Sequence, residues 1–209
     1  MMNQELGCLM DTIILLTGIA GTGKRTIGQA ISHINPAFTL LHHHDYLDPI
    51  LKQFDNSPQN SNPDSIWWNL DDKGWDALKK ARKAAFDNIT YASPKNSSFV
   101  ITYELLNNNI YHQAIFDEIK EISTVRKSLF IPVRLICELN ELIKRLTHPE
   151  RKQYYKTQDT ELIRKRFSSD AVFQSNLKNE LTLDVSKLSP EESAKKILAW
   201  VDNNAKNIS

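Results

Sequence analysis

The sequence predicts a three-layer α/β fold, in which helices cover both faces of a five-stranded parallel sheet. Three observations support this prediction. Short runs of aliphatic and β-branched residues recur along the chain, helical patterns separate them, and the first run ends in a glycine-rich turn. We expect the strands at residues 12–17, 38–41, 99–102, 129–136 and 181–185.

The helices between these strands are expected from apolar residues that recur with a 3.6-residue period. The first covers 23–34 and ends before Pro36, and the clearest covers 75–89, with lysines on its opposite side. A capping box formed by Ser189 and Glu192, with proline at the first helical position, begins the last helix. Helices and strands therefore alternate, as right-handed crossovers between parallel strands require.

Composition excludes several classes of protein. The 209 residues suit one domain, 24% of them are charged and 41% are hydrophobic, so wholesale disorder and collagen-like repeats are excluded. Lys and Arg total 26 against 25 Asp and Glu, which argues against a uniformly basic nucleic-acid-binding protein. No apolar run resembles a signal peptide or approaches the roughly 18 residues of a membrane span. Cys8 and Cys137 are far apart, so we expect no disulfide framework or zinc site, and a cytoplasmic location.

Two segments carry strong local charge that the near-neutral total hides. Residues 45–76 contain seven Asp against two Lys, whereas residues 144–166 contain eight Lys or Arg against three acidic residues. The chain is therefore expected to be dipolar, with an acidic and a basic segment outside the minimal sheet.

The glycine-rich turn carries the most specific motif. Residues 18–24 fit the phosphate-loop (P-loop) pattern G-x-x-x-x-G-K, directly after a strand and at the start of a helix. In that pattern the backbone N–H groups of the loop surround a phosphate, and Lys24 approaches the β- and γ-phosphates. The alternative, a glycine-rich turn with a chance lysine, does not explain this context. The predicted phosphate-binding residues are Gly18, Ala20, Gly21, Thr22, Gly23, Lys24, Arg25 and Thr26.

One residue departs from the motif. The residue after the lysine is normally Ser or Thr, whose hydroxyl binds Mg²⁺, but here it is Arg25, and Thr26 follows one position later. One helical residue is a rotation of about 100°, so Thr26 does not simply occupy the same place. We expect Mg²⁺ to be held through water, by Thr26 after an adjustment, or by a carboxylate elsewhere, for which Glu104 at the end of the third strand is the candidate.

The spacing of Gly18, Gly21, Gly23, Lys24 and Thr26 resembles that of shikimate, gluconate and adenylate kinases. The resemblance extends to the layout of residues 12–203 and implies a P-loop NTPase fold that binds ATP and Mg²⁺. It also implies a helical acceptor-binding insertion at 45–95 and a basic lid at 145–160. The chain is similar as well to bacterial P-loop proteins described only as ATP-binding.

This resemblance assigns roles to three further residues. An Asp just past the second strand commonly holds the acceptor hydroxyl in such kinases, and Asp45 has that position. Asp45 is equally suited to cap a helix over 46–54. Lid arginines close over the transferring phosphoryl group, and Arg145 and Arg151 are the candidates, although eight basic residues can simply form a solvated face.

Other side chains have a structural and a functional interpretation. His42 and His44 are expected on one face of a strand, packed or touching the acceptor rather than ligating a metal. Trp67, Trp68 and Trp75 are expected to pack as helical residues, with stacking on an acceptor as the alternative. Arg82 is expected at the surface, with an anionic acceptor group as its alternative partner.

The sequence therefore predicts an ATP-dependent kinase acting on a small-molecule hydroxyl. The acidic insertion favours a neutral or cationic acceptor over a nucleoside monophosphate. The alternative is a nucleotide-binding switch that acts through a protein partner. A role on nucleic acid is disfavoured by the charge and length, no membrane partner is expected, and the oligomeric state is left open.

Overall fold

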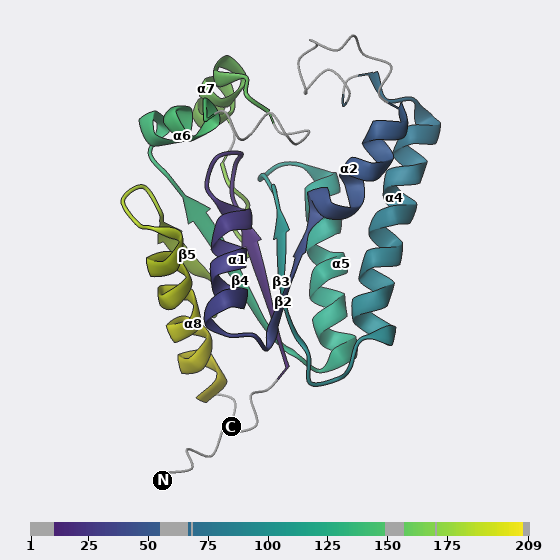
Figure 1. Cartoon of the computed structure of the whole chain (residues 1–209), viewed down its shortest axis with the longest axis vertical. Coiled ribbons are helices and arrows are strands. Elements are labelled where there is room, and N and C mark those ends of the chain that lie inside the picture. The colour runs from purple at the N-terminus through teal and green to yellow at the C-terminus, as the bar shows by residue number, and fades with distance from the viewer. Residues whose placement is uncertain (1–10, 55–66, 68, 149–156, 170, 207–209) are drawn as a thin grey trace.

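The computed structural model describes residues 11–54, 67, 69–148, 157–169 and 171–206. Five strands form one parallel sheet in the order β2-β3-β1-β4-β5 (Figure 1). Their bounds are β1 Thr12–Thr17, β2 Phe38–His42, β3 Ser98–Tyr103, β4 Leu129–Ile136 and β5 Leu181–Asp184. The predicted sheet is confirmed, and the predicted strands differ from these bounds by no more than one residue at either end.

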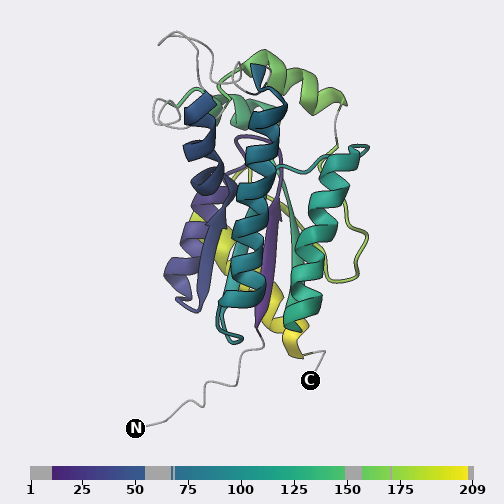
Figure 2. The ribbon, with the colours of Figure 1, turned by 90° about the vertical axis from the view of Figure 1, so that its right-hand side faces the viewer.

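Helices cover both faces of the sheet, as the sequence predicts (Figures 1 and 2). On one face, α1 (Lys24–Ile34) and α8 (Pro190–Lys206) pack against Ile14 and Leu16 of β1. On the other, α5 (Ile110–Arg126) packs against Ile13 and Leu15. Successive residues of a strand point to opposite faces, so a strand buried on both sides must be apolar throughout, as β1 is.

Within the predicted insertion at 45–95, the described helices are α2 (His43–Phe54), α4 (Asp72–Asp87) and the short π-helix η1 (Asn88–Ala92). Leu47, Leu51 and Leu78 form a small core between α2 and α4. The N-cap of α4 is Asp71, whose side chain accepts a hydrogen bond from the Gly74 amide at 2.8 Å. The insertion is thus a helical pair with its own apolar contact.

The start of α2 overturns two expectations. The helix begins at His43, so Asp45 lies inside its first turn and does not cap a helix over 46–54. His42 ends β2 while His44 belongs to α2, so the two histidines do not share a strand face. The period-two pattern fails here because the strand turns into the helix without an intervening loop.

The remaining helices lie at the carboxyl ends of the strands (Figure 1). These are α6 (Leu139–Leu146) and α7 (Thr160–Ser169), so the predicted lid at 145–160 includes the end of α6 and the first residue of α7. The capping box of α8 is confirmed, because the Ser189 hydroxyl accepts from the Glu192 amide at 3.1 Å and the Glu192 carboxylate accepts from the Ser189 amide at 2.8 Å. None of the described helices combines the length and apolar composition that crossing a bilayer requires.

A buried ion pair fastens the opposite, amino end of the sheet. The Arg126 side chain, 2% exposed, donates from Nε and Nη2 to Asp11 Oδ2 at 2.9 and 2.6 Å. Arg126 also donates to four backbone carbonyls, those of Ile89, Ser93, Pro94 and Ser97. One guanidinium therefore connects the end of α5, the start of β1 and the whole return from η1 to β3.

Replacing Arg126 with Met should destabilise the protein by about 3–5 kcal/mol in urea unfolding, because it leaves a buried carboxylate and several carbonyls without their partner. Burial already raises the pKa of Asp11, and the hydrogen bonds and charge of Arg126 partly offset that rise. In Arg126→Met the pKa of Asp11 therefore rises further. The difference in unfolding free energy between the variant and the wild type should then shrink as the pH falls towards the ordinary carboxyl pKa of 3.8, because the carboxylate of the variant is protonated first.

The control is Lys83→Met, which breaks an exposed ion pair with Asp87 and should leave the unfolding midpoint close to that of wild type. Equal effects of the two substitutions would contradict the anchoring role of Arg126.

Candidate functional site

A cavity of about 1190 Å³ lies at the carboxyl ends of the strands. Its lining comes from the glycine-rich loop, the start of α1, the end of β2, helices α2, α4, α5 and α7, and the residues that follow β3. Parallel sheets bind ligands at this edge because the loops there converge from several strands. The cavity therefore brings the P-loop and the helical insertion into one space.

Two glycines of the predicted P-loop adopt a backbone conformation that other residues rarely adopt. Gly21 and Gly23 adopt φ values of 92° and 86°, in the left-handed region that favours glycine. The Thr22 hydroxyl is buried and donates to the Ile19 carbonyl at 2.9 Å, which holds the loop closed. Gly23 then forms the N-cap of α1, so the first turn of that helix directs its amides towards the loop.

The Lys24 ammonium lies within the loop. Its Nζ donates to the carbonyls of Gly18 and Ile19 at 2.6 and 3.1 Å, and the residue is 8% exposed. Ala20, Gly21 and Gly23 line the cavity together with Lys24. A cation and a set of backbone amides thus face the same space, which is the chemistry that binds phosphate.

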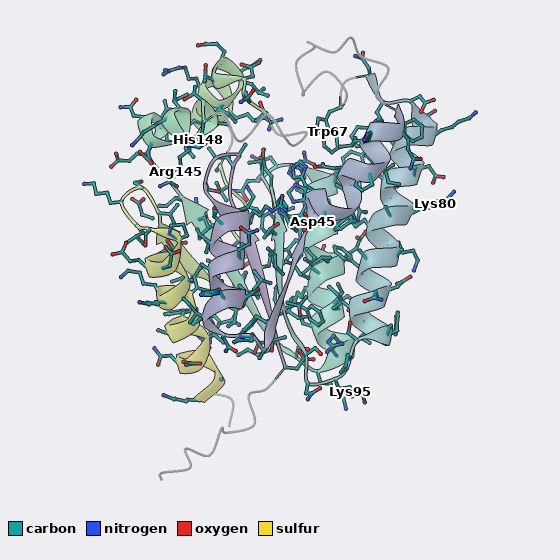
Figure 3. The ribbon with its side chains drawn as sticks, viewed as in Figure 1. Asp45, Trp67, Lys80, Lys95, Arg145 and His148 are labelled. Atoms are coloured by element: carbon teal, nitrogen blue, oxygen red, sulfur yellow. The ribbon has the colours of Figure 1, made fainter. Side chains whose placement is uncertain are left out.

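Arg25 and Asp45 form an ion pair at the edge of the site. Arg25 Nη2 lies 3.2 Å from Asp45 Oδ1, and the side chains are 26% and 48% exposed. Arg25 is among the residues that line the cavity, whereas Asp45 is not. Figure 3 shows Asp45 near the start of α2, beside the P-loop helix. The first turn of α1 is thereby tied to the insertion.

The two predicted metal ligands have other partners. The Thr26 hydroxyl donates to the Gly23 carbonyl at 3.0 Å, and Glu104 Oε1 accepts from Arg166 Nη1 at 2.7 Å. Across the described ranges, no group of three or more His, Cys, Asp or Glu side chains is placed to hold a metal ion. Thr26 and Glu104 both line the cavity, but they do not form a ready Mg²⁺ site.

Among the described Lys and Arg residues of the basic segment 144–166, Arg166 is the one that lines the cavity. Arg145 instead contacts Glu141 at 2.8 Å and the Val185 carbonyl at 2.9 Å, and it is not part of the cavity lining. Figure 3 shows Arg145 on the side of the P-loop away from the insertion. Arg151 lies outside the described residues, as do Lys152 and Lys156. Leu162 and Arg166 are one turn apart on α7 and both line the cavity, a helical spacing that could have identified Arg166.

Three consecutive histidines pack together beside the P-loop, with ring centroids 4.3–5.3 Å apart, and all three line the cavity. His42 Nδ1 hydrogen-bonds the buried Thr102 hydroxyl at 2.6 Å, and His43 Nδ1 hydrogen-bonds the Thr102 carbonyl at 3.0 Å. His44 Nδ1 lies 2.6 Å from Asp48 Oδ1. The first two histidines thus join the ends of β2 and β3, while the third forms a His–Asp pair within α2.

The insertion side of the cavity combines aromatic rings with an ion pair. Trp67 and Trp75 both line it, with ring centroids 6.3 Å apart, and Trp68 lies outside the described residues. Arg82 lines the cavity rather than the outer surface and makes a bidentate contact with Glu118 at 2.9 and 3.1 Å. This wall can contact both an apolar ring and a polar group.

A hydrogen-bonded pair of tyrosines lies behind this wall. The hydroxyls of Tyr46 and Tyr103 are 2.9 Å apart, and the Tyr103 ring stacks on His43. Burial raises the pKa of both tyrosines, so both hydroxyls stay protonated at neutral pH.

The acidic segment does not make the cavity acidic. Asp45 and Asp48 pair with Arg25 and His44, Asp71 caps α4, and Asp76 pairs with Lys80 on the exposed face. Of the acidic residues described in 45–76, Asp72 lines the cavity. The full lining contains five Lys or Arg against three Asp or Glu. The sequence analysis expected a neutral or cationic acceptor because residues 45–76 are acidic. The arrangement of these carboxylates does not support that expectation.

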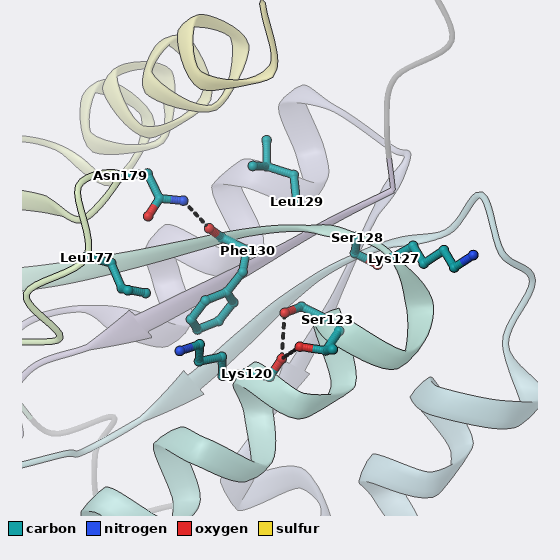
Figure 4. A pocket seen from close by; sticks show the side chains of 9 residues that line it. Lys120, Ser123, Lys127, Ser128, Leu129, Phe130, Leu177 and Asn179 are labelled. Carbon is teal, nitrogen blue, oxygen red and sulfur yellow. Dashed lines mark hydrogen bonds between the residues drawn. The ribbon is translucent and has the colours of Figure 1, made fainter. Parts of the chain in front are cut away.

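A second hollow of about 450 Å³ lies between the end of α5 and the start of β4 (Figure 4). Its polar groups include Lys120, Lys127 and the hydroxyls of Ser123 and Thr124, both of which donate to the Lys120 carbonyl. This hollow lies at the amino end of the sheet, away from the P-loop, and its hydroxyls are committed to the helix backbone.

Comparison with known proteins supports the fold. No family model matches the sequence, and no protein of described function matches it by sequence. Among solved structures, a gluconokinase from Sinorhizobium meliloti 1021 covers 96% of this chain and 96% of its own, with 17% identity and a TM-score of 0.60. A candidate kinase from Chloroflexus aurantiacus J-10-fl covers 96% and 99%, with 18% identity and a TM-score of 0.61.

A shikimate kinase from Acinetobacter baumannii in complex with shikimate covers 94% and 96%, with 17% identity and a TM-score of 0.51. The chain therefore has the α/β fold of P-loop kinases, as the sequence predicts. At these identities the likeness concerns the fold, and activity has to be argued from the site.

The geometry of the site leads to a prediction for Thr102. Replacing this fully buried residue with Val keeps its shape but removes the hydroxyl bonded to His42, and should cost about 1–3 kcal/mol in urea unfolding. Thr102→Ser retains the hydroxyl and is the matched control. A larger loss for Ser than for Val would show that packing, rather than the hydrogen bond, holds these strand ends together.

Proposed function

We propose that the protein is an ATP-dependent kinase that transfers the γ-phosphoryl group to the hydroxyl of a small molecule. The observation that carries the proposal is that Lys24 of the P-loop and His44 and Trp75 of the insertion line one cavity. A nucleotide phosphate and an acceptor can thus meet in one space, where positioning supplies most of the catalysis of phosphoryl transfer.

At the nucleotide end, the P-loop amides and the α1 N-terminus would bind the β- and γ-phosphates. Lys24 would exchange its contacts with the Gly18 and Ile19 carbonyls for phosphate oxygens. Mg²⁺ would accompany ATP as a counter-ion on the phosphates and would neutralise charge there. Since Thr26 and Glu104 do not form a ready site for it, we assign no step to a metal held by the protein.

At the acceptor end, His44 is suited to take the proton. A neutral imidazole that donates from Nδ1 to the Asp48 carboxylate carries its lone pair on Nε2. As the acceptor oxygen bonds to the γ-phosphorus and the bond to the ADP oxygen breaks, the hydroxyl proton passes to that nitrogen. Asp45, the residue expected from the sequence, would instead position Arg25, with which it is paired.

On the lid side, Arg166 is the side chain suited to contact the transferring phosphoryl group. It lines the cavity, and its planar guanidinium matches the equatorial oxygens. Glu104 would hold it in place until phosphate competes for it. Arg145 would stabilise α6 against the end of β5 through Val185, and Arg151 remains a predicted lid residue.

The acceptor wall favours a molecule with a ring and polar substituents. Trp67 and Trp75 offer aromatic faces, and the Arg82–Glu118 pair offers both a cation and a carboxylate. Sugars, cyclic hydroxy acids, nucleosides and aminoglycosides all combine these features, and they define the class of acceptor to be tested.

The proposal predicts that ATP binds in calorimetry and that one of these acceptor classes accelerates ADP release well above the background rate. Lys24→Met should weaken ATP binding by about tenfold or more, because it removes a charged contact to phosphate. Lys95→Met, at the opposite end of the molecule, is the matched control (Figure 3). If ATP binds but no acceptor accelerates ADP release, the alternative hypothesis of a nucleotide-binding switch is favoured. If Lys24→Met binds ATP as tightly as Lys95→Met does, the role of the P-loop in ATP binding is refuted.

Replacing His44 with Gln should lower kcat for the responding acceptor by about a hundredfold or more and change its KM little, because a base acts mainly in the transition state. ATP affinity should stay unchanged, since His44 is assigned to the acceptor. The control is His33→Gln, on the exposed side of α1. Equal kcat values for the two variants would exclude His44 as the base.

A further inference from the structure

We propose that Arg25 replaces the metal-binding hydroxyl of this P-loop with a direct cationic contact to the nucleotide phosphates, so that ATP binding depends little on Mg²⁺. The proposal rests on the nucleotide site proposed above. It concerns the one position at which this loop departs from the motif.

Arg25 occupies the position that the motif gives to the metal-binding hydroxyl. In the P-loop motif, the residue after the lysine carries the hydroxyl that binds the metal beside the β- and γ-phosphates. Here Lys24 has its ammonium inside the loop, and Arg25, the next residue of α1, also lines the cavity. The edge of the phosphate cradle where a hydroxyl is expected therefore carries a guanidinium.

The guanidinium of Arg25 is held by an ion pair with Asp45. Asp45 contacts it at 3.2 Å from the first turn of α2, and Asp45 does not itself line the cavity. A guanidinium has five N–H donors in a planar fork, so it can contact a carboxylate and phosphate oxygens at the same time. Asp45 thus orients the arginine without placing its own charge in the cavity.

The oxygens of Thr26 and Glu104, the two predicted metal ligands, already have hydrogen-bond partners within the protein. The Thr26 hydroxyl donates to the Gly23 carbonyl, and Glu104 is paired with Arg166. Across the described ranges no cluster of three metal-ligating side chains is present. The lining has five Lys or Arg against three Asp or Glu, so the cavity itself carries positive charge to offset the phosphates. Cationic side chains therefore supply the neutralisation that a protein-bound metal supplies elsewhere.

The test is the dissociation constant of ATP, measured by calorimetry in EDTA and again with excess Mg²⁺. For the wild-type protein we expect the two values to differ by less than about threefold, within the energy of a weak hydrogen bond. Arg25→Ser restores the hydroxyl of the motif. It should weaken binding in EDTA by about tenfold or more, and added Mg²⁺ should recover most of that loss.

Two further variants separate the charge of Arg25 from its ion pair. Asp45→Asn breaks the pair but keeps the cation, so it should weaken binding in EDTA far less than Arg25→Ser does, because the arginine loses part of its orientation but none of its charge. Lys80→Ser removes a cation from the exposed face of α4 and should leave both constants unchanged. If Asp45→Asn weakened binding as much as Arg25→Ser, the ion pair rather than the cation would be responsible, and the inference would be overturned.

The failure of the inference can be told from the failure of the proposed function. Steep Mg²⁺ dependence in the wild-type protein, or unchanged binding in Arg25→Ser, overturns the role of Arg25 and leaves a nucleotide-binding P-loop. Absence of ATP binding with and without Mg²⁺ overturns the nucleotide site and the inference together.

Discussion

The alignment of β1 with its two neighbours is the constraint on which the site depends. Ile14 of β1 pairs with Val100 of β3 on one side and with Ile131 of β4 on the other. Because the strands are parallel and in this register, their carboxyl ends lie at one edge of the sheet. The loop after β1 therefore lies beside Tyr103 and Glu104, and a slip along either neighbour would separate this loop from the other residues that line the cavity.

Three arginine–carboxylate pairs then assemble the cavity from elements that are distant in sequence. Arg25–Asp45 joins α1 to α2, Arg82–Glu118 joins α4 to α5, and Arg166–Glu104 joins α7 to the end of β3. All six side chains are partly exposed, so these pairs contribute little to stability. Their effect is positional, and an anionic ligand that enters the cavity competes with the carboxylates for the same guanidinium groups.

The sequence was sufficient for features that depend on neighbouring residues. The strands and the Ser189–Glu192 capping box follow from local patterns, and the structure has each of them. The glycine-rich turn after β1 was likewise expected, and Gly21 and Gly23 adopt the left-handed backbone there. A short continuous run of apolar residues predicts a strand buried on both faces wherever it occurs in a chain. The fold was therefore largely predictable.

The site was predictable only in part, because its remaining contacts join distant segments. Asp45 was identified as important, but its partner Arg25 is twenty residues away and no spacing rule relates them. The charge of residues 144–166 was evident, yet it did not reveal that Arg166 lines the cavity while Arg145 contacts the Val185 carbonyl, just after β5. The number of charged residues in a segment does not predict where each side chain points, because that direction depends on how the helix packs.

The guanidinium of Arg126 also anchors one end of the helical insertion. It holds the carbonyls of η1 and of the segment leading to β3, so the lower end of α4 is fixed while the upper end faces the cavity. A helix of 16 residues is about 24 Å long, so a rotation of about 5° at the fixed end displaces the other end by about 2 Å. Helix α4 is thus anchored at the end furthest from the cavity, and a tilt of this size about that end would shift the wall that carries Trp75 by about the radius of a water molecule.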